Sequence, residues 1–355
     1  MFLEARLGLR YRQQVSSPVG LSSPTGLFAH LETPLDNIHR RKSSVALLSV
    51  ISNSALVILK IAIGILIGSV SVISEAIHSG VDLLAAIIAL FAVRSSGKPA
   101  DDAHPFGHGK IENISGTIEA LLIFVAGIWI IYEAVMKLTH PHPMAEPGLG
   151  VAIMLVSALA NMFVSHMLFK VGKETDSVAL QADGWHLRTD VYTSAGVMGG
   201  LALIWICKRL IPGENLQWID PAAAIAVALL IIHTSYKLTV ESGKDLLDAS
   251  LPADEEDWIR EYISGLNGIV RGFHRLRTRK AGSHRFVQFH LLVSADMSVD
   301  RSHKLHDDIV AAIKERFPAS TITIHIEPCD ATCSENCIEG CFLSEKEREA
   351  IRKPA

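Results

Sequence analysis

Two apolar stretches of the chain carry ionisable side chains at matching positions. In the first stretch, residues 71–94, these side chains are Glu75, His78 and Asp82. In the second stretch, residues 183–208, they are Asp183, His186 and Asp190. Both sets follow the spacing i, i+3 and i+7, which places the three side chains on one face of a helix. The sequence therefore predicts two helices whose polar faces can meet.

The imidazoles and the last carboxylate of each face have the chemistry of a metal site. Together the two faces supply two imidazoles and two carboxylates, from His78, Asp82, His186 and Asp190. Two carboxylates balance the charge of one divalent cation, and four nitrogen and oxygen ligands suit tetrahedral zinc. An Asp at the centre of a transmembrane helix costs about 2.5–3.5 kcal/mol, so we expect these residues to be functional. The alternative is a polar cluster that only holds the helices together.

The composition indicates a membrane domain joined to a soluble domain. Of the 355 residues, 49% are hydrophobic, and the mean hydropathy of +0.31 is too high for an ordinary soluble protein. Yet 20% of the residues are charged, which is too many for a chain that lies wholly in a membrane. The formal net charge of −4 gives no reason to expect a nucleic-acid partner.

Six transmembrane helices are expected between residues 43 and 242, after an N-terminal extension, residues 1–42, that we expect to be disordered. Each is an apolar stretch of at least about the 20 residues that span a bilayer. The helices are expected at residues 43–67, 71–94, 112–137, 148–170, 180–208 and 219–240. Lys and Arg are concentrated before the first helix and after the second and fourth. This distribution places both termini in the cytoplasm.

Residues 251–330 have the composition of a small soluble domain. Their pattern predicts the order α-β-β-α-β, a ferredoxin-like or metallochaperone-like α+β unit with helices on one face of a sheet. A tail, residues 331–355, follows, and cysteines recur every four residues at Cys329, Cys333, Cys337 and Cys341. Thiolates at this spacing can bind zinc or copper(I), but an unstructured tail is an equally good interpretation.

Five motifs resemble those of the cation diffusion facilitator family of metal-efflux transporters. In the helical part they are HSGVD at 78–82, DDAHPFGHGKIE at 101–112 and ADGWHLRTD at 182–190. In the soluble part they are GFHRLRTRKAG at 272–282 and IHIEPC at 324–329. The resemblance covers about residues 36–330. It implies a homodimer in the lipid bilayer that exchanges a divalent metal ion for protons.

The same resemblance implies where metal ions bind. It places the transport site on the two imidazoles and two carboxylates of the paired helices. A loop site falls on Asp101, His104 and His108, and a cytoplasmic site falls on His274, His290, His303, His325 and Glu327. Lys110 and Asp248 match a charge pair that joins the two domains. His306, one helical turn from His303, can take the place of His303. At the two positions after His325 this sequence has Ile326 and Glu327, where some relatives have Gln and Asp.

The expected function is secondary active transport and not enzymatic catalysis. We expect a Zn²⁺/H⁺ antiporter that works by alternating access in a bacterial-type inner (cytoplasmic) membrane, with Zn²⁺ also bound as a regulatory ion. Fe²⁺, Mn²⁺, Co²⁺ and Cd²⁺ are the alternative ions, because ligand type alone does not exclude them. Two other classes stay open, namely a metal channel without proton coupling and a metal sensor that its helices only anchor.

Overall fold

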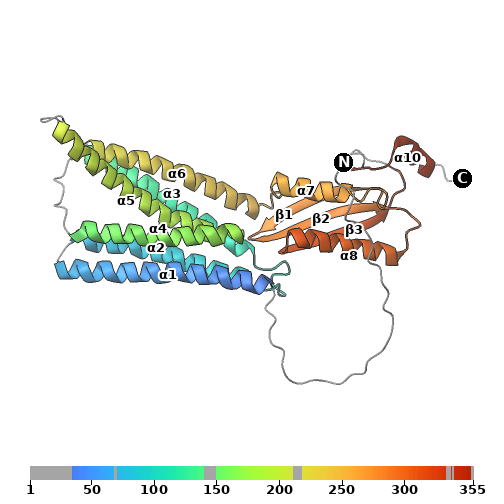
Figure 1. Ribbon diagram of the computed structural model, residues 1–355, viewed down its shortest axis with the longest axis horizontal. Helices are drawn as coiled ribbons and strands as arrows, with labels where there is room; N and C mark the ends of the chain where they lie inside the picture. Colours follow the sequence, from blue (N-terminus) through green and yellow to red (C-terminus); the bar gives the residue numbers. More distant parts are fainter. Residues whose placement is uncertain are drawn as a thin grey trace, which may run out of the picture. The chain divides into compact units, whose positions relative to one another are not determined.

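The structure, a computed structural model, describes residues 34–67, 70–139, 149–210, 218–332, 337 and 340–352. Its first part consists of six long helices: α1 (Pro34–Ile67), α2 (Val70–Ser96), α3 (Lys110–Thr139), α4 (Leu149–Glu174), α5 (Val178–Leu210) and α6 (Ile219–Leu246) (Figure 1). All six predicted helices are present. However, α1 begins at Pro34 and not at residue 43, so the last part of the expected N-terminal extension is helical. Residues 1–33 of that extension lie outside the described residues.

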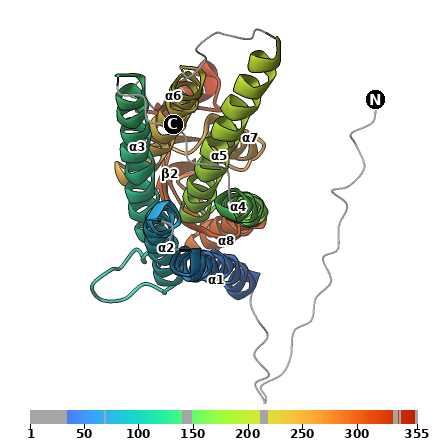
Figure 2. The same cartoon turned by 90° about the vertical axis from the view of Figure 1, so that its left-hand side faces the viewer.

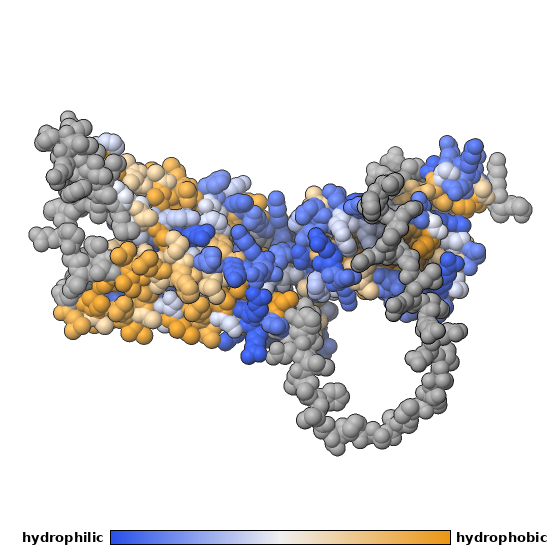
Figure 3. All heavy atoms as spheres, viewed as in Figure 1, coloured by the Kyte–Doolittle hydropathy of each residue, from blue (hydrophilic) through white to orange (hydrophobic). Residues whose placement is uncertain are grey.

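Five of these helices are long and apolar enough to cross a membrane: α1, α2, α3, α4 and α6. The sixth, α5, has 33 residues, but Asp183, Arg188 and Asp190 make its first half more polar. Apolar residues cover much of the outer surface of the helices, as the orange area in Figure 3 shows. The arrangement agrees with the predicted six-helix membrane domain, and the polar part of α5 is where candidate ligands lie.

Small side chains let the helices approach one another closely. Ala46 of α1, Ala89 of α2 and Ala179 of α5 are completely buried. A Cβ at Gly127 of α3 would come within 2.7 Å of Ile232 of α6. Such small residues are typical of helix contacts in membranes, where close packing replaces the hydrophobic effect. Seen along the helices in Figure 2, α3 lies beside α6, α1 beside α2, and α4 beside α5.

The second part is a small domain whose elements follow the predicted order α-β-β-α-β. They are α7 (Ala253–Ser264), β1 (Gly272–Ala281), β2 (His284–Val293), α8 (Val299–Arg316) and β3 (Ser320–Pro328). In the sheet, β2 lies between β1, with which it pairs antiparallel, and β3, with which it pairs parallel. A tight turn at Gly282, which has a φ of 58°, joins β1 to β2. The parallel pair needs a longer crossover, and α8 provides it.

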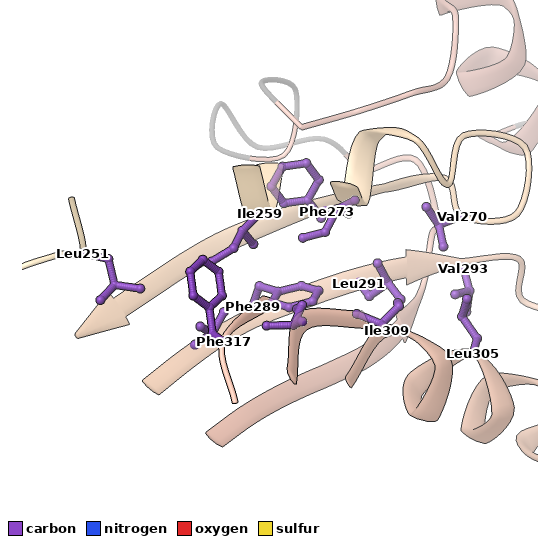
Figure 4. Close-up of a cluster of buried hydrophobic side chains, with 13 residues drawn as sticks. Leu251, Ile259, Val270, Phe273, Phe289, Leu291, Val293, Leu305, Ile309 and Phe317 are labelled. Carbon is purple, nitrogen blue, oxygen red and sulfur yellow. The ribbon is translucent and has the colours of Figure 1, made fainter. Parts of the chain in front are cut away.

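Both helices of this domain cover the same face of the sheet, where the core lies (Figure 4). Ile259 of α7 and Ile309 of α8 pack with Phe289 and Leu291 of β2. Because successive side chains of a strand point to opposite faces, His290 between them lies on the face that the helices leave uncovered. A further short helix that the sequence did not predict, α10 (Glu345–Arg352), lies in the tail.

Candidate metal centres

The two polar helix faces meet inside the helical part. His78 and Asp82 of α2 and Asp190 of α5 each offer a ligand atom, and these three atoms lie within 4.8 Å of one another. The fourth predicted ligand, His186 of α5, joins the group because its Nε2 lies 3.1 Å from Oδ1 of Asp82. Asp82 and His186 are both buried. The structure thus brings together the four side chains that the matching spacing singled out.

Side chains from two other helices border this group. Asn161 of α4 points its Nδ2 toward Oδ2 of Asp190, at a distance of 3.5 Å. Lys60 of α1 is buried and donates a hydrogen bond of 2.7 Å to Oγ of Ser79, next to His78. Neither Asn161 nor Lys60 is among the predicted metal ligands. Their signal was a polar side chain within an otherwise apolar span, which usually marks a functional position.

The intramembrane group lies between two cavities. The smaller cavity, about 130 Å³, is bordered by α1, α2, α4 and α5 and includes Lys60. The larger cavity, about 530 Å³, lies among α2, α3, α5 and α6 and reaches Glu133 and Lys137 near the end of α3. The other end of α3 begins at Lys110, which contacts Asp248 just before the C-terminal domain. The larger cavity therefore leads from the group toward the helix ends that are remote from the C-terminal domain.

A buried ion pair occupies the opposite end of the helices. Nζ of Lys42 in α1 lies 3.0 Å from Oε1 of Glu112 in α3, and both side chains are at most 1% exposed. Glu112 also accepts hydrogen bonds from Ser96 of α2, at 2.7 Å, and from Ser177 just before α5. Lys42 donates to Oγ of Ser283 in the β1–β2 turn, at 2.9 Å. The carboxylate of Glu112 thus links three segments of the helical part to α3. Lys42 also connects them to the C-terminal domain through Ser283.

The predicted loop site forms between α2 and α3. Ligand atoms of Asp101, His104 and His108 lie within 4.8 Å of one another. The backbone N–H of His104 donates to Oδ1 of Asp101 at 2.6 Å, and this hydrogen bond holds the pKa of the Asp101 carboxyl below its ordinary value. Nδ1 of His108 is buried and has no hydrogen-bond partner among the described residues. An ionised carboxylate beside two imidazoles suits a divalent cation.

Three histidines lie side by side on the uncovered face of the sheet. His274 of β1 is the register partner of His290 of β2, which is the partner of His325 of β3. The ring centroids are 5.1 Å apart for His274 and His290, and 4.7 Å apart for His290 and His325. Residues directly opposite each other on one sheet face are close neighbours. The strand register therefore assembles these imidazoles, which we call the histidine row.

Glu327 of β3 contacts every member of the histidine row. Its Oε1 lies 2.8 Å from Nε2 of His274, and its Oε2 lies 3.3 Å from Nδ1 of His290 and 3.5 Å from Nε2 of His325. Donor atoms of His274, His290 and Glu327 lie within 4.8 Å of one another. Imidazoles with one carboxylate are a usual ligand set for zinc. Although Glu327 differs from the residue found in some relatives, it supplies a carboxylate at the centre of the site.

Within one chain, the predicted ligand His303 lies apart from the histidine row. It lies on α8, which covers the opposite face of the sheet, and its side chain is 73% exposed. Its Nε2 lies 3.5 Å from Oδ2 of Asp307, and these two residues form a separate donor group with His306. Among the described residues, no donor group joins His303 to the histidine row.

Two of the predicted cysteine ligands lie beside the histidine row. Cys329 and Cys337 are buried and line a cavity that also includes His274 and Glu327. Cys341 is partly exposed, and Cys333 lies outside the described residues. The tail therefore returns at least one thiol, that of Cys337, to the sheet.

The predicted charge pair joins the two domains in this structure. Nζ of Lys110 lies 3.0 Å from Oδ1 of Asp248. Asp248 follows the end of α6 with a φ of 57°, a left-handed conformation that often ends helices, and it also lies 3.2 Å from Arg279 of β1. The hydrogen bond from Lys110 holds the pKa of the Asp248 carboxyl below its ordinary value.

Comparisons with known proteins agree with this arrangement over most of the chain. The family model of the cation efflux transmembrane domain matches residues 46–247, and that of the cation efflux protein, cytoplasmic domain, matches residues 251–329. An uncharacterized transporter of Synechocystis sp. is 38% identical over 285 residues, which are 80% of this chain and 90% of that protein. The cation-efflux pump FieF of Citrobacter koseri is 30% identical over 296 residues, which are 83% of this chain and 96% of the pump.

Two solved structures of CzrB, a protein described as a candidate zinc transporter, match a smaller part of this chain. One is 38% identical and covers 22% of this chain and 98% of its own, with a TM-score of 0.22. A zinc form of the same protein is 34% identical and covers 24% of this chain and 97% of its own, with a TM-score of 0.23. Together the two family models match nearly all of the chain from α1 to the end of β3. The chain therefore belongs to the cation diffusion facilitator family of metal-cation efflux transporters.

Proposed function

We propose that this family member is a divalent metal/proton antiporter whose preferred cargo is Zn²⁺. One observation carries the proposal: His78, Asp82 and Asp190 offer ligand atoms within 4.8 Å inside the helices, and His186 is bonded to Asp82. Two imidazoles and two carboxylates match the tetrahedral preference of zinc, and the carboxylates balance its charge. Desolvated ionisable groups on facing helices are typical of an ion pathway.

The two ends of the helical part support alternating access. The larger cavity leads from the site toward the ends of α3 and α6 that are remote from the C-terminal domain. At the near end, the Lys42–Glu112 pair joins α1 to α3. With both termini in the cytoplasm, this cavity gives access to the cargo site from the outside. An inward-facing state then requires α3 and α6 to move against the other helices. The contacts of Glu112 must then break or rearrange.

Protons drive the cycle because they compete with the metal for the same atoms. A carboxylate or imidazole must be deprotonated before it can bind a metal ion. An imidazole in water titrates near pH 6.5, close to physiological pH. In a more acidic outer compartment, protons therefore displace Zn²⁺ from the ligands. The protonated site then carries these protons inward. The sequence holds no G-x-x-x-x-G-K-[ST] motif for an ATP-driven step.

The C-terminal domain acts as the cytoplasmic sensor of the same cargo. Both termini then lie in the cytoplasm of a bacterial-type inner membrane, and the histidine row binds Zn²⁺ from that side. In a homodimer, the exposed His303 of one copy is available to the histidine row of the other. The Lys110–Asp248 pair and the contact of Lys42 with Ser283 carry the change to α3 and α1.

Metal flux into sealed proteoliposomes under an imposed pH gradient tests the antiport. We expect Zn²⁺ to move uphill when the gradient is present, and the movement to stop when a protonophore collapses it. A channel would give downhill flux that ignores the pH gradient, and an anchored sensor would give no flux. Either result would refute the proposal. Repeating the assay with Cd²⁺, Fe²⁺, Mn²⁺ and Co²⁺ ranks the cargo, and a faster ion than Zn²⁺ would overturn the zinc preference.

A further inference from the structure

The C-terminal tail is bound to the start of β1 by backbone hydrogen bonds. The N–H of Phe273 donates to O of Gly340 at 3.0 Å, and the N–H of Phe342 donates to O of Arg271 at 3.0 Å. A Cβ at Gly340 would come within 1.9 Å of O of Phe273, so this close contact requires glycine. Phe342 also packs against the core of the domain. Residues 340–342 are therefore a docked part of the C-terminal domain.

Two thiols lie on the sheet face that carries the histidine row. Cys329 follows β3 directly, and its N–H donates to O of Val293 at 2.9 Å. Cys329 and Cys337 are 6% and 8% exposed, and both pack with Leu292 of β2. Leu292 stands two residues after His290, so it points to the same face as His290.

The two thiols share a cavity with two members of the neighbouring metal site. The cavity has a volume of about 350 Å³, and Cys329 and Cys337 line it together with His274 and Glu327. Cysteines that serve only as small apolar residues are expected in close packing, because protein interiors contain few voids larger than a water molecule. Here the thiols border a hollow that also contains an imidazole and a carboxylate, which are the other usual zinc ligands.

We propose that Cys329 and Cys337 are thiolate ligands of a soft divalent cation, Zn²⁺ or Cd²⁺, and that His274 and Glu327 complete the set. Two sulfurs, one nitrogen and one oxygen suit tetrahedral coordination, and thiolates favour softer ions than nitrogen and oxygen donors alone. Among the described residues, no three donors that include a cysteine lie within 4.8 Å of one another. Binding therefore requires these four donors to come closer together than they lie in this structure.

This inference deepens the proposed sensing role, because it makes the tail part of the sensor. It also predicts that the sensor responds to Zn²⁺ and Cd²⁺ in preference to Mn²⁺, which prefers oxygen ligands. None of the four proposed transport ligands is a thiol, so the cargo site and the sensor can be tested separately by the type of ligand.

Titration of the full-length, detergent-purified and reduced protein with Co²⁺ tests the thiolate ligands. Cobalt bound to sulfur gives an intense charge-transfer band in the near ultraviolet, which cobalt bound only to nitrogen and oxygen lacks. We expect the band in the wild type and its loss in the double variant C329S/C337S. The matched control is C207S, which changes the one cysteine of the sequence that lies outside residues 329–341, in α5. In a competition assay, Cd²⁺ affinity at this site should fall at least about tenfold, since even an outer-shell change costs that much.

Absence of the band in the wild type, or its survival in the double variant, would overturn the proposal. Circular dichroism shows whether the double variant is folded; if it is not, C329S and C337S are measured singly, and each should give a weaker band. A band that both single variants leave unchanged refutes the assignment. The variant His78→Ala separates this proposal from the transport site, because it should lose Zn²⁺ flux and keep the band.

Discussion

Individual side chains of the intramembrane site depend on one another for charge and orientation. Asp82 is 4% exposed, and Oδ1 of its carboxylate lies 3.1 Å from Nε2 of His186. Asp190 faces Asn161 of a third helix. A carboxylate in such a position supplies both a ligand atom and half of the charge that balances a dication. These two roles can be separated by substitution, because an amide keeps the shape and removes the charge.

The substitution Asp82→Asn should therefore weaken Zn²⁺ binding and stop transport while the fold is kept. The amide can still bond to His186, but the site loses one negative charge and its strongest oxygen donor. We expect Zn²⁺ affinity to fall by at least about 10–100-fold, the loss reported for weaker changes around metal ligands. Titration calorimetry and zinc flux measure the two effects. Glu241→Gln, which makes the same acid-to-amide change at an exposed carboxylate of α6, is the matched control. An Asp82→Asn variant with normal affinity would contradict the ligand assignment.

The helices and strands position these residues through a small number of contacts between elements. Glu112 at the start of α3 joins α1, α2 and the segment before α5, and Lys42 extends the contact to the β1–β2 turn. Gly109, the residue before α3, allows a close approach to the end of β1, because a Cβ there would lie 2.3 Å from O of Ala281. The movements of α3 and of the C-terminal domain are therefore linked at this end of the helices.

Replacement of Lys42 by Met should destabilise the protein strongly. It leaves the carboxylate of Glu112 buried without its cation, and breaking a buried pair in this way costs about 3–5 kcal/mol. Arg41→Met is a matched control one residue earlier. Arg41 pairs with Glu174 at the surface, where a salt bridge contributes only about 0–1 kcal/mol.

The midpoint of thermal unfolding in detergent compares the two variants. We expect a clear decrease for Lys42→Met and little change for Arg41→Met. Equal midpoints for both variants would show that the buried pair does not hold these elements together.

The pair between Lys110 and Asp248 predicts a dependence of stability on pH. Its hydrogen bond lowers the pKa of Asp248 in the folded protein. A lowered pKa means that the pair stabilises the fold above the unfolded pKa, about 3.9, and that the contribution is lost as the pH falls below it. Asp248 is half exposed, so the contribution is at most about 1 kcal/mol.

Asp248→Asn should therefore unfold at a slightly lower temperature than the wild type at pH 7, and the difference should shrink in acid. Thermal unfolding midpoints over a pH series measure this difference. A difference that stays constant as the pH falls below about 3.9 would show that the charge of Asp248 contributes nothing.

At the scale of the whole molecule, the sequence predicted the arrangement of residues within a single helix or strand better than it predicted contacts between distant segments. Helical spacing predicted that His78, Asp82, His186 and Asp190 share facing surfaces. Strand alternation predicted that His325 and Glu327 point to one side. Both are periodicities of a single element, and the chain obeys them locally.

Of the contacts between distant segments, the sequence predicted those that a motif marks, such as Lys110 with Asp248. It did not predict contacts that no motif or local pattern records. Lys42 and Glu112 are 70 residues apart, and in the sequence each is an ordinary charged residue beside an apolar span. The return of Cys337 to the sheet depends on docking of the tail at β1. His303 shares a chain with the histidine row, but the crossover to β3 puts its helix on the other face. Topology, which spacing does not reveal, decided these positions.

The central claim is that a divalent ion crosses the membrane between α2 and α5 on the side chains of His78, Asp82, His186 and Asp190. Zn²⁺ flux in proteoliposomes tests it most directly, measured for His78→Ala and Asp190→Ala beside the control His166→Ala, which changes an exposed histidine of α4. We expect flux at the background level for the first two variants and normal flux for the control. Full Zn²⁺ flux in either of the first two, at equal protein incorporation, would contradict the account.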